Sequence, residues 1–453
     1  MSMHIKTGDE PSLTQQFTQF IVDQQFKDLS QEAIHAAKRG VLDWLGCALA
    51  ASHHPTVEPL IEVLQENDSS PQATVMGRSF KLSHVDAPLV NGQMGHLLDF
   101  DDTHMGGVVL HASSPTLSAL FSESERQKSS GQDFVLAYIC GFEAGVRVGQ
   151  SSPNHHAQGW HLTGTLGHFA ASVAVGKLLK LNPQQLTYAM GIAGTQASGM
   201  QQNRGTSCKS FHAGRAGSNG LLAARLAMKG FNSSEEIIDG KRGFSRIYSQ
   251  QSLPEKMTQN LGSSWEIERN GFKPYACGVV IHPAIDAMIE FKKSGLCEVG
   301  QVRKIEVFVN PIVLSITGTV SPVTGLHSKF SIYHSVAVAL VDGRAGIEQY
   351  TDLKAADPLV TKVRDLITIT SDETLGRDQA RANIFWDGGH REINIECALG
   401  TVLHPLSDID LQEKFIANAK ACLSEDRAKQ ICNLVWQLDQ LPSVQPILDL
   451  CQG

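Results

Sequence analysis

The feature that most constrains the fold is a series of helical segments rich in glycine and alanine. Apolar residues recur at three- and four-residue spacing through roughly the first 270 residues, which is the period of an amphipathic helix. The segment 214–230 carries Gly214, Gly217 and Gly220. Because glycine lowers helix propensity, such helices are stable only when they are buried and closely packed. We therefore predict a compact bundle of largely buried helices. The segments predicted to be helical are 12–26, 30–50, 83–100, 131–149, 161–181 and 214–230.

The pattern changes near residue 270. The segment 302–311 alternates polar and apolar residues and has β-branched side chains, which is typical of a strand. The segment 391–400 alternates in the same way after the turn-like sequence WDGG. A helix is predicted between them at 331–343, and helical periodicity returns at 411–441. The sequence thus predicts an α+β insertion in a mainly α chain.

Charge and composition exclude several classes of function. The formal net charge is −8 and no block of basic residues occurs, which argues against nucleic acids and anionic membrane surfaces as partners. No run of 18 apolar residues exists and the N-terminal sequence is polar, so we expect neither a membrane span nor a signal peptide, and a cytoplasmic location. The nine cysteines are widely spaced without CxxC, so we predict no disulfide framework, zinc site or iron–sulfur cluster.

Four clusters of polar residues interrupt the apolar segments. Each has an ordinary structural explanation, such as solvated acids at a helix end or a histidine at a helix start. Lys209 and Arg215 are harder to explain in this way, because their helix is otherwise small and apolar and buried cations need an anionic partner. That partner is either a protein carboxylate or a substrate carboxylate. The clusters are His96–His111, His155–His168, Lys209–Arg215 and Lys273–His282.

The first cluster raises the question of a metal site. Asp99, Asp101, Asp102 and His104 offer suitable ligand atoms, but neither the EF-hand spacing nor HExxH is present. We therefore predict no metal and no cofactor. Clusters of histidine, lysine and aspartate without a metal motif indicate acid–base chemistry on a small anionic molecule.

Blocks in all four clusters resemble the MmgE/PrpD family, which includes 2-methylcitrate dehydratase, cis-aconitate decarboxylase and iminodisuccinate epimerase. The resemblance covers nearly the whole chain and keeps the family order of blocks. It implies a helical domain formed by residues 1–270 and 403–453, a smaller α/β lid domain at 271–402, a metal-free cleft between them, and a homodimer. The blocks are VLDWLGCALA (41–50), NGQMGHLLDFDDTH (91–104), GWHLTGTLGHFAA (159–171), KSFHAGRAGSNGLLAA (209–224), KPYACGVVIHPAIDA (273–287) and LQEKFIANA (411–419).

Site residues follow from the resemblance block by block. The loop after Thr103 is longer than in the family pattern, so His104 competes with His111 for one histidine position. Cys277 stands where the mammalian decarboxylase has histidine, and His334 takes the tyrosine position of a block that reads FSIYH here. The predicted catalytic residues are Asp99, Thr103, His104, His111, His161, Lys209, Cys277 and His334; the predicted substrate-binding residues are Lys273, Tyr275, Arg215, His212 and Tyr333.

The predicted substrate is a small di- or tricarboxylate. Lysines would neutralise its carboxylate in a dry cleft while histidines move a proton at the neighbouring carbon, and Asp99 would orient one histidine or itself take the proton. The leading hypothesis is a hydro-lyase that dehydrates a 2-methylcitrate-like hydroxy acid. The alternatives are decarboxylation of cis-aconitate to itaconate, epimerisation of an amino or imino dicarboxylate, and a relative that binds a carboxylate without catalysis.

Overall fold

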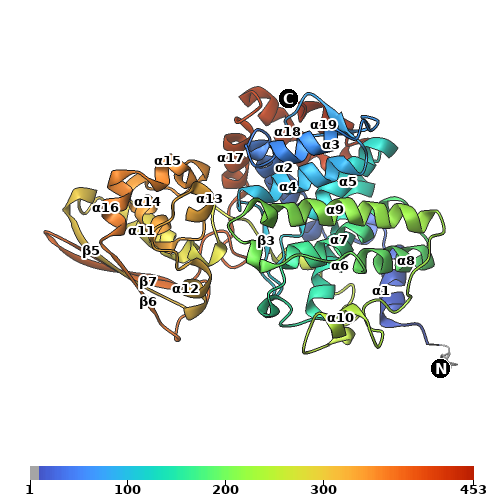
Figure 1. Ribbon diagram of the computed structural model, residues 1–453, viewed down its shortest axis with the longest axis horizontal. Helices are drawn as coiled ribbons and strands as arrows, with labels where there is room; N and C mark the ends of the chain where they lie inside the picture. Colours follow the sequence, from blue (N-terminus) through green and yellow to red (C-terminus); the bar gives the residue numbers. More distant parts are fainter. Residues whose placement is uncertain (1–9) are drawn as a thin grey trace.

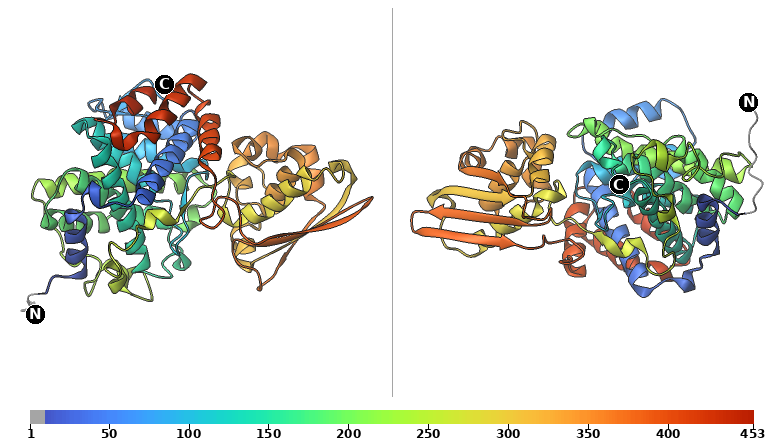
Figure 2. Two further views of the ribbon diagram at one scale, coloured as in Figure 1. Left: turned by 180° about the vertical axis from the view of Figure 1, so that it is seen from behind. Right: turned by 90° about the horizontal axis from the view of Figure 1, so that it is seen from below.

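A computed structural model describes residues 10–453 (Figure 1). Helices make up 56% of the structure and strands 9%, so the predicted mainly α fold with a small sheet-containing part is confirmed. Two parts lie side by side in every view of Figures 1 and 2, a larger helical part and a smaller part that carries the sheet. The first nine residues of the polar N-terminal sequence lie outside the described residues.

Helix α7, Leu162–Leu178, forms the centre of the helical part. Every residue of α7 except Lys177 is buried, which is the pattern of a helix enclosed on all sides. Four helices pack around it, α5 (Ser113–Gln127), α6 (Gly131–Gln150), α8 (Pro183–Gly194) and α9 (Ser207–Met228). The other helices of this part are α1 (Leu13–Asp23), α2 (Gln31–Ala51), α3 (Glu58–Gln65), α4 (Asp86–Leu97) and α10 (Phe244–Ile247).

The predicted close approach of glycine-rich helices occurs between α4 and α9. A Cβ atom added to Gly92 would lie 2.7 Å from the Cα of Gly214, and one added to Gly214 would overlap the carbonyl oxygen of Leu89. The two backbones therefore meet with no side chain between them. This contact places the end of α4 beside the start of α9, where the candidate site lies.

The C-terminal helices return to the helical part. The helix predicted at 411–441 is instead two helices, α17 (Asp408–Ala419) and α18 (Glu425–Trp436), and α19 (Gln445–Leu450) follows. The break has a local cause, because the Ser424 hydroxyl accepts a hydrogen bond from the backbone N–H of Arg427 and caps a new helix. Helix α17 packs against α2, as Figure 1 shows, where Lys414 pairs with Asp43.

The smaller part is built on a four-stranded sheet. Its order is β6 (Ile367–Ser371), β5 (Val302–Val309), β7 (Ala380–Trp386) and β8 (Gly389–Ile395), with β5 and β6 parallel and the other pairs antiparallel. Both predicted strands are present, and WDGG forms the β7–β8 turn. Strands β6 and β7 were not predicted. Helices α11 (His282–Lys293) and α14 (Ile332–Asp342) pack with the sheet (Figure 2); the others are α12 (Pro311–Thr317), α13 (Gly325–Ser328), α15 (Asp352–Ala355) and α16 (Pro358–Arg364).

Two short β pairs lie in or beside the helical part. Strand β1 (Ala73–Thr74) pairs with β2 (Lys81–Leu82), and β3 (Thr103–His104) pairs with β4 (Asn270–Gly271). The second pair ties the loop after α4 to the segment that leads into the sheet-containing part. The division of the chain at residues 271 and 402 stays a prediction. No helix within residues 10–453 combines the length and apolar character needed to cross a bilayer.

Replacing Gly214 by alanine will test the α4–α9 contact. The new methyl group would meet backbone atoms that cannot move independently, and overpacking of this kind costs about 1–3 kcal/mol. We expect Gly214→Ala to lower the midpoint of thermal unfolding by several degrees. Gly300→Ala is the matched control, because a Cβ atom there meets nothing within 4 Å. Equal midpoints for the two variants would refute the close contact.

Candidate active site

The candidate site is centred on the loop that follows α4. The sequence interpretation extended this helix to Phe100, but the structure ends it at Leu97. Asp99 has a φ of 52°, in the left-handed region that non-glycine residues rarely occupy. The chain therefore turns sharply at Asp99. Such a conformation persists only when surrounding contacts hold it in place.

Three buried lysines supply those contacts. Three successive carbonyl oxygens each accept a hydrogen bond from a different lysine amine, and the three lysines come from segments far apart in the sequence. The pairs are Lys329 with Leu98 at 2.7 Å, Lys273 with Asp99 at 3.0 Å and Lys414 with Phe100 at 2.7 Å.

Two of these lysines also bind the segment that opens the sheet-containing part. Lys414 donates to the Lys273 carbonyl at 2.9 Å, and Lys329 donates to the Ala276 carbonyl at 2.8 Å. The Asp99 loop and the segment carrying Lys273 are thus fixed to each other from both sides. Sequence reasoning missed both Lys329 and Lys414. A signal for Lys414 existed, because it lies on the buried face of α17 with Leu411 and Phe415.

The Asp99 carboxylate joins the lysines of both parts. Its Oδ1 accepts from Lys209 Nζ at 3.0 Å and from Lys273 Nζ at 2.9 Å. Burial alone would raise the pKa of Asp99, but the two ammonium charges outweigh it and hold the pKa well below its ordinary value. Asp99 is therefore ionised, and its charge makes the burial of Lys273 possible.

Positive charge exceeds negative charge at this point. Lys329 is 3% exposed and forms no ion pair with any carboxylate of residues 10–453. Its pKa is lowered to about 8 by burial, against the opposing charge of Asp99. The three ammonium groups of Lys209, Lys273 and Lys329 meet two ionised carboxylates, Asp99 and Asp101, so one positive charge is uncompensated.

Histidines gather beside the lysines. The Nδ1 atom of His96 lies 2.8 Å from Asp101 Oδ2, and the His96 ring stacks on His161 with ring centres 5.4 Å apart. The His111 ring centre lies 4.8 Å from that of His96, and its Nδ1 lies 2.7 Å from the Asp102 carbonyl oxygen. The sequence analysis expected Asp99 either to take the proton itself or to orient a histidine. In the structure Asp101 does so, and His96 was not among the predicted site residues.

The remaining histidines and the threonine of the cluster lie around this core. His161 precedes α7, and its Nδ1 lies 3.0 Å from Nδ1 of His212. Thr103 Oγ1 lies 3.1 Å from His111 Nδ1. Burial lowers the pKa of His161 well below its ordinary value and that of His111 to about 3, so both imidazoles are neutral in the free protein.

Asp101 and Asp102 differ in charge although they are neighbours. Burial would raise the pKa of Asp101, but the imidazoles of His96 and His111 hold it below its usual range. Burial raises the pKa of Asp102 to about 8; the charge of Asp43 adds to the increase, and hydrogen bonds from Ser113 and Asn270 oppose it. Asp102 is thus a neutral acid near pH 7, and it connects the loop after α4 to Ser113 and Asn270 through hydrogen bonds.

Four predicted site residues are placed elsewhere. His104 Nε2 pairs with Glu266 at 3.0 Å, and its Nδ1 lies 2.8 Å from the Val108 carbonyl oxygen. Arg215 is exposed on α9. The Tyr275 hydroxyl donates to Asp286, and His334 Nε2 lies 2.8 Å from the Gln349 carbonyl within the sheet-containing part. His104, Tyr275 and His334 thus contact partners outside the Asp99 cluster, and Arg215 is exposed to solvent.

Cys277 and Tyr333 take up different positions. Cys277 is fully buried, and burial raises the pKa of its thiol to about 12, so it is not an acid–base group near neutral pH. Tyr350, which the sequence analysis did not single out, lies beside Cys277, and Lys329 Nζ lies 5.0 Å from its ring centre. Tyr333 is half-buried and joins the apolar packing.

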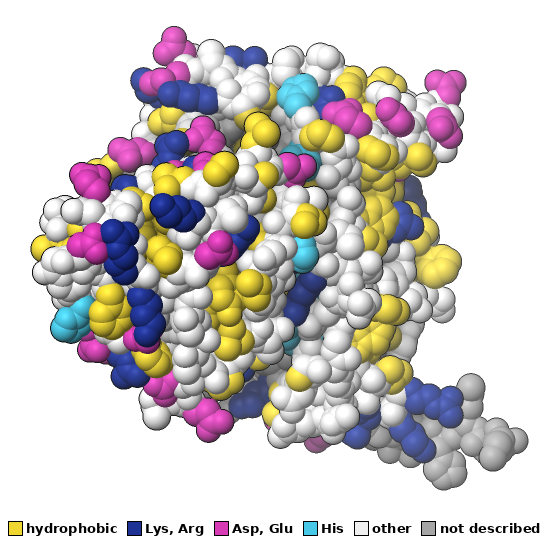
Figure 3. All heavy atoms as spheres, turned by 60° about the vertical axis from the view of Figure 1, so that its left-hand side comes forward, with side chains coloured by type: hydrophobic (Ala, Val, Ile, Leu, Met, Phe, Trp, Pro, Cys, Tyr) yellow, Lys and Arg dark blue, Asp and Glu magenta, His cyan; other side chains and the backbone are white. Residues whose placement is uncertain are grey.

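The cluster opens into a small cavity between the two parts. Its volume is about 10 Å³, room for about one water molecule. Figure 3 shows histidine and basic side chains along the line where the two parts meet. A tricarboxylate is larger than this cavity, so side chains that line it must move when a substrate binds. The lining residues are His96, Leu97, Asp99, Gly205, Thr206, Lys209, Ser210, Leu326 and Phe330.

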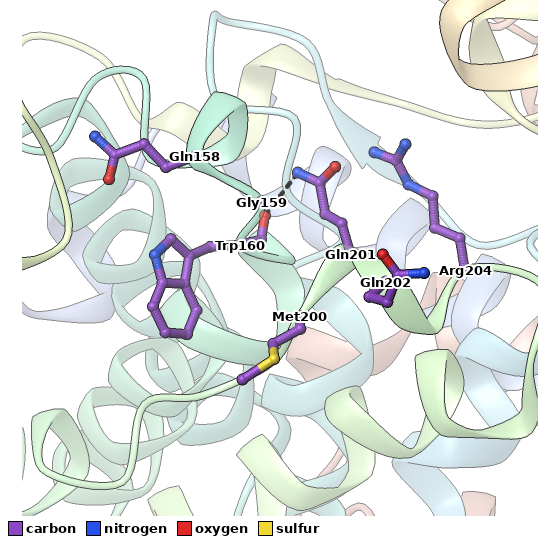
Figure 4. Close-up of a pocket in the computed structure, with 7 residues that line it drawn as sticks. All are labelled: Gln158, Gly159, Trp160, Met200, Gln201, Gln202 and Arg204. Carbon is purple, nitrogen blue, oxygen red and sulfur yellow. Dashed lines mark hydrogen bonds between the residues drawn. The ribbon is translucent and has the colours of Figure 1, made fainter.

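A wider groove of about 620 Å³ lies on the outer side of the helical part (Figure 4). It is lined by two segments, 158–160 and 200–204, which come shortly before His161 and Lys209. Gln201 joins the segments by donating to the Trp160 carbonyl at 2.9 Å. The groove therefore borders the backbone that positions two cluster residues.

One group of side chains has the composition of a metal site. His96, Asp101 and His111 offer three ligand atoms within 4.8 Å of one another. The Nδ1 atoms of both histidines already have hydrogen-bond partners, which are Asp101 for His96 and the Asp102 carbonyl oxygen for His111. These contacts account for the arrangement as a hydrogen-bonded cluster.

Comparison with known proteins gives one family for both parts. The model of the MmgE/PrpD N-terminal domain matches residues 15–256, and that of the C-terminal domain matches residues 275–440. A cis-aconitate decarboxylase of Aspergillus terreus is 28% identical, over 93% of this chain and 92% of the relative. The Homo sapiens cis-aconitate decarboxylase is 26% identical over 98% and 95%, and a 2-methylcitrate dehydratase of Cupriavidus necator 24% over 82% and 80%.

Stability measured against pH will separate the two neighbouring aspartates. Because the pKa of Asp102 is raised in the folded state, folding retains a proton that the unfolded chain releases, and this contribution falls as pH rises toward 8. Asp102→Asn lacks this loss, so its stability relative to wild type will increase between pH 5 and 8, by up to about 1.4 kcal/mol per pH unit.

Asp101→Asn provides the contrast. Because the pKa of Asp101 is lowered in the folded state, its ionisation stabilises the fold at pH values above the ordinary pKa of aspartate. This stabilisation is lost as the pH falls below that value. We expect this variant to be less stable than wild type at pH 7, with a deficit that shrinks in acid. Chemical unfolding at each pH measures both variants. The same pH trend for both would contradict the assigned charge states.

Proposed function

The chain belongs to the MmgE/PrpD family, and from this premise we propose that it decarboxylates a small tricarboxylate of the cis-aconitate type. As a member of this family it is an enzyme of the lyase type. The sequence analysis favoured dehydration. We now favour decarboxylation, because the relatives named as decarboxylases match nearly the full chain, whereas the named dehydratase matches less of it at lower identity.

The observation that carries the proposal is the uncompensated positive charge around Asp99. A buried charge without a partner is costly, and a carboxylate ligand would remove that cost. Lys209 is the lysine that lines the cavity, and its side chain is 14% exposed. It is positioned to exchange part of its contact with Asp99 for a substrate carboxylate. The site thus favours an anion with more than one carboxylate.

Loss of carbon dioxide suits this arrangement. When the bond between a carboxylate and its carbon breaks, the electron pair passes into the neighbouring double bond and develops as charge next to a second carboxylate. Fixed ammonium groups stabilise that charge, and they do so strongly in a site from which water is excluded. The reaction needs no base to begin. It needs cations for the remaining carboxylates and one proton donor for the carbanion.

Dehydration is the second candidate, supported by the dehydratase relative and by the neutral histidines. A neutral imidazole can remove the proton next to a carboxylate, and a second group would protonate the departing hydroxyl.

Epimerisation requires acid–base groups on opposite faces of the substrate. His161 stacks on His96, which lines the cavity with Lys209, and this grouping of imidazoles with a cation supports catalysis over binding alone.

Incubation of the purified protein with cis-aconitate will test the proposed reaction. We expect release of carbon dioxide and formation of itaconate, both measurable by chromatography and gas analysis. The same assay with 2-methylcitrate reports dehydration through the ultraviolet absorbance of an unsaturated product. Unsaturated product from 2-methylcitrate without carbon dioxide from cis-aconitate would replace the decarboxylase proposal with the dehydratase.

A lysine substitution will connect the reaction to the site. Lys209→Met removes the cavity-lining cation, so we expect kcat/KM to fall by about 100-fold or more. Lys177→Met is the control, since Lys177 is a part-buried lysine of the helical part whose amine donates to carbonyl oxygens far from the cleft, those of Ile21, Val22 and Gln24. Equal activity of the two variants would remove Lys209 from the mechanism.

Removal of divalent metals gives a further prediction. The proposed chemistry uses lysines and histidines alone, so dialysis against EDTA should leave the rate of carbon dioxide release unchanged. The dialysed protein is assayed with and without added zinc and manganese. A loss of activity that one of these metals restores would favour metal binding at His96, Asp101 and His111.

A further inference from the structure

His96 and Asp101 form a buried imidazole–carboxylate pair at the wall of the cavity. The His96 side chain is fully buried, as is that of Asp101, and 2.8 Å separates His96 Nδ1 from Asp101 Oδ2. An ionised carboxylate can only accept a hydrogen bond. His96 therefore carries its proton on Nδ1 and donates it to Asp101, and this leaves Nε2 with a lone pair.

That second nitrogen has no partner. No hydrogen bond reaches His96 Nε2 from any of residues 10–453, although the atom is buried. Most buried polar atoms are hydrogen-bonded, so an unpartnered one calls for an explanation. His96 lines the small cavity together with Asp99 and Lys209. A bound substrate would lie between the lysine and this free nitrogen.

The other histidines of the cluster have Nδ1 atoms that contact groups other than an ionised carboxylate. His111 Nδ1 is engaged with the Asp102 carbonyl and with Thr103, and His161 Nδ1 is engaged with His212. Among residues 10–453, neither histidine has a carboxylate within hydrogen-bond distance. Asp101 Oδ2 lies 3.8 Å from His111 Nδ1. A carboxylate fixes the tautomer and, through its negative charge, also stabilises an imidazolium. Among these three histidines, His96 has that support.

We propose that His96, oriented by Asp101, is the proton donor of the reaction, acting through Nε2. This inference rests on the proposed function, which supplies the carbanion that needs a proton. Asp101 does not touch the substrate and acts as a positioning residue. The role had been assigned by sequence to His111, His104 or His161.

The proton can be followed through one turnover. As the anionic substrate binds, its negative charge next to His96 favours the imidazolium, and Nε2 takes a proton from solvent. The bond to the leaving carboxylate then breaks, and the electron pair moves through the neighbouring double bond to its far carbon. That carbon takes the proton from Nε2. Carbon dioxide and a dicarboxylate leave, and His96 returns to its neutral form.

The charged groups facing His96 explain why the proton arrives only with substrate. Burial lowers the pKa of His96 in the free protein, Asp101 and Asp99 oppose this effect, and Lys209 adds to it. A tricarboxylate reverses the balance by neutralising the lysines. The titratable groups that face His96 are Asp99, Asp101, His111, His161, Lys209 and His212.

Kinetics of His96→Gln, Asp101→Asn and the double variant test the pair. We expect His96→Gln to lower kcat by about 100-fold or more while KM changes less, since the cations that bind substrate remain. Asp101→Asn should also lower kcat, and the double variant should be no slower than His96→Gln, because the two residues act as one unit. Additive losses, or a near-normal kcat for His96→Gln, would overturn the proposal.

His84→Gln is the matched control. His84 is a buried histidine paired with a carboxylate, Glu123, at 2.7 Å, but its other nitrogen is also engaged, with Ser122, and it lies outside the cavity. We expect this variant to keep the wild-type kcat whatever its effect on thermal stability. A loss of kcat equal to that of His96→Gln would mean that removal of any buried histidine disturbs the site.

A measurement that needs no turnover separates this inference from the proposed function. In protein labelled with ¹⁵N-histidine, His96 should appear as the Nδ1–H tautomer, and binding of propane-1,2,3-tricarboxylate, which lacks the double bond that the reaction uses, should convert it to imidazolium. Calorimetry in two buffers should record an uptake of about one proton on binding that His96→Gln lacks. If no carbon dioxide is released, the proposed function fails. An Nε2–H tautomer, or no change on binding, overturns the His96 proposal itself.

Discussion

The carbonyl oxygens of Leu98, Asp99 and Phe100 hold the site together, because each is bound by the amine of a buried lysine. One lysine belongs to the sheet-containing part, one to the segment that leads into it, and one to a C-terminal helix. These contacts offset the cost of the left-handed conformation at Asp99, which is of order 1–3 kcal/mol. They also fix the positions of the groups that follow, from the Asp99 carboxylate to His111.

The charge of this assembly decides what it can bind. The Asp99 carboxylate pairs with both Lys209 and Lys273, whereas among residues 10–453 Lys329 pairs with no carboxylate and donates to carbonyl oxygens. Burial keeps the nearby histidines neutral. The free protein therefore has an excess positive charge next to His96 Nε2, a proton acceptor that has no hydrogen-bond partner among residues 10–453. An anionic substrate supplies the missing charge. It also changes the protonation of the histidine that is placed to react, so binding and chemistry are linked through electrostatics.

Much of the fold could be predicted from the sequence, because helical periodicity and glycine spacing are local signals. Gly214 is an example, because its spacing with Gly217 and Gly220 predicted a close helix approach, and the structure shows that approach at Gly92 of α4. The loop after α4 could not be predicted, since a left-handed turn at Asp99 depends on lysines more than 100 residues away in the sequence. Arg215 is a different case, because six residues from Lys209 on a helix point about 120° away from it, so its exposure could have been foreseen.

A crystal structure with a bound tricarboxylate tests the central claim most directly. We expect a substrate carboxylate against Lys209 in the cavity lined by His96, with the three carbonyl oxygens of 98–100 still bound by their lysines and Asp99 still left-handed. A ligand bound in the outer groove of Figure 4, or release of those carbonyl oxygens on binding, would contradict the role assigned to the lysine cluster.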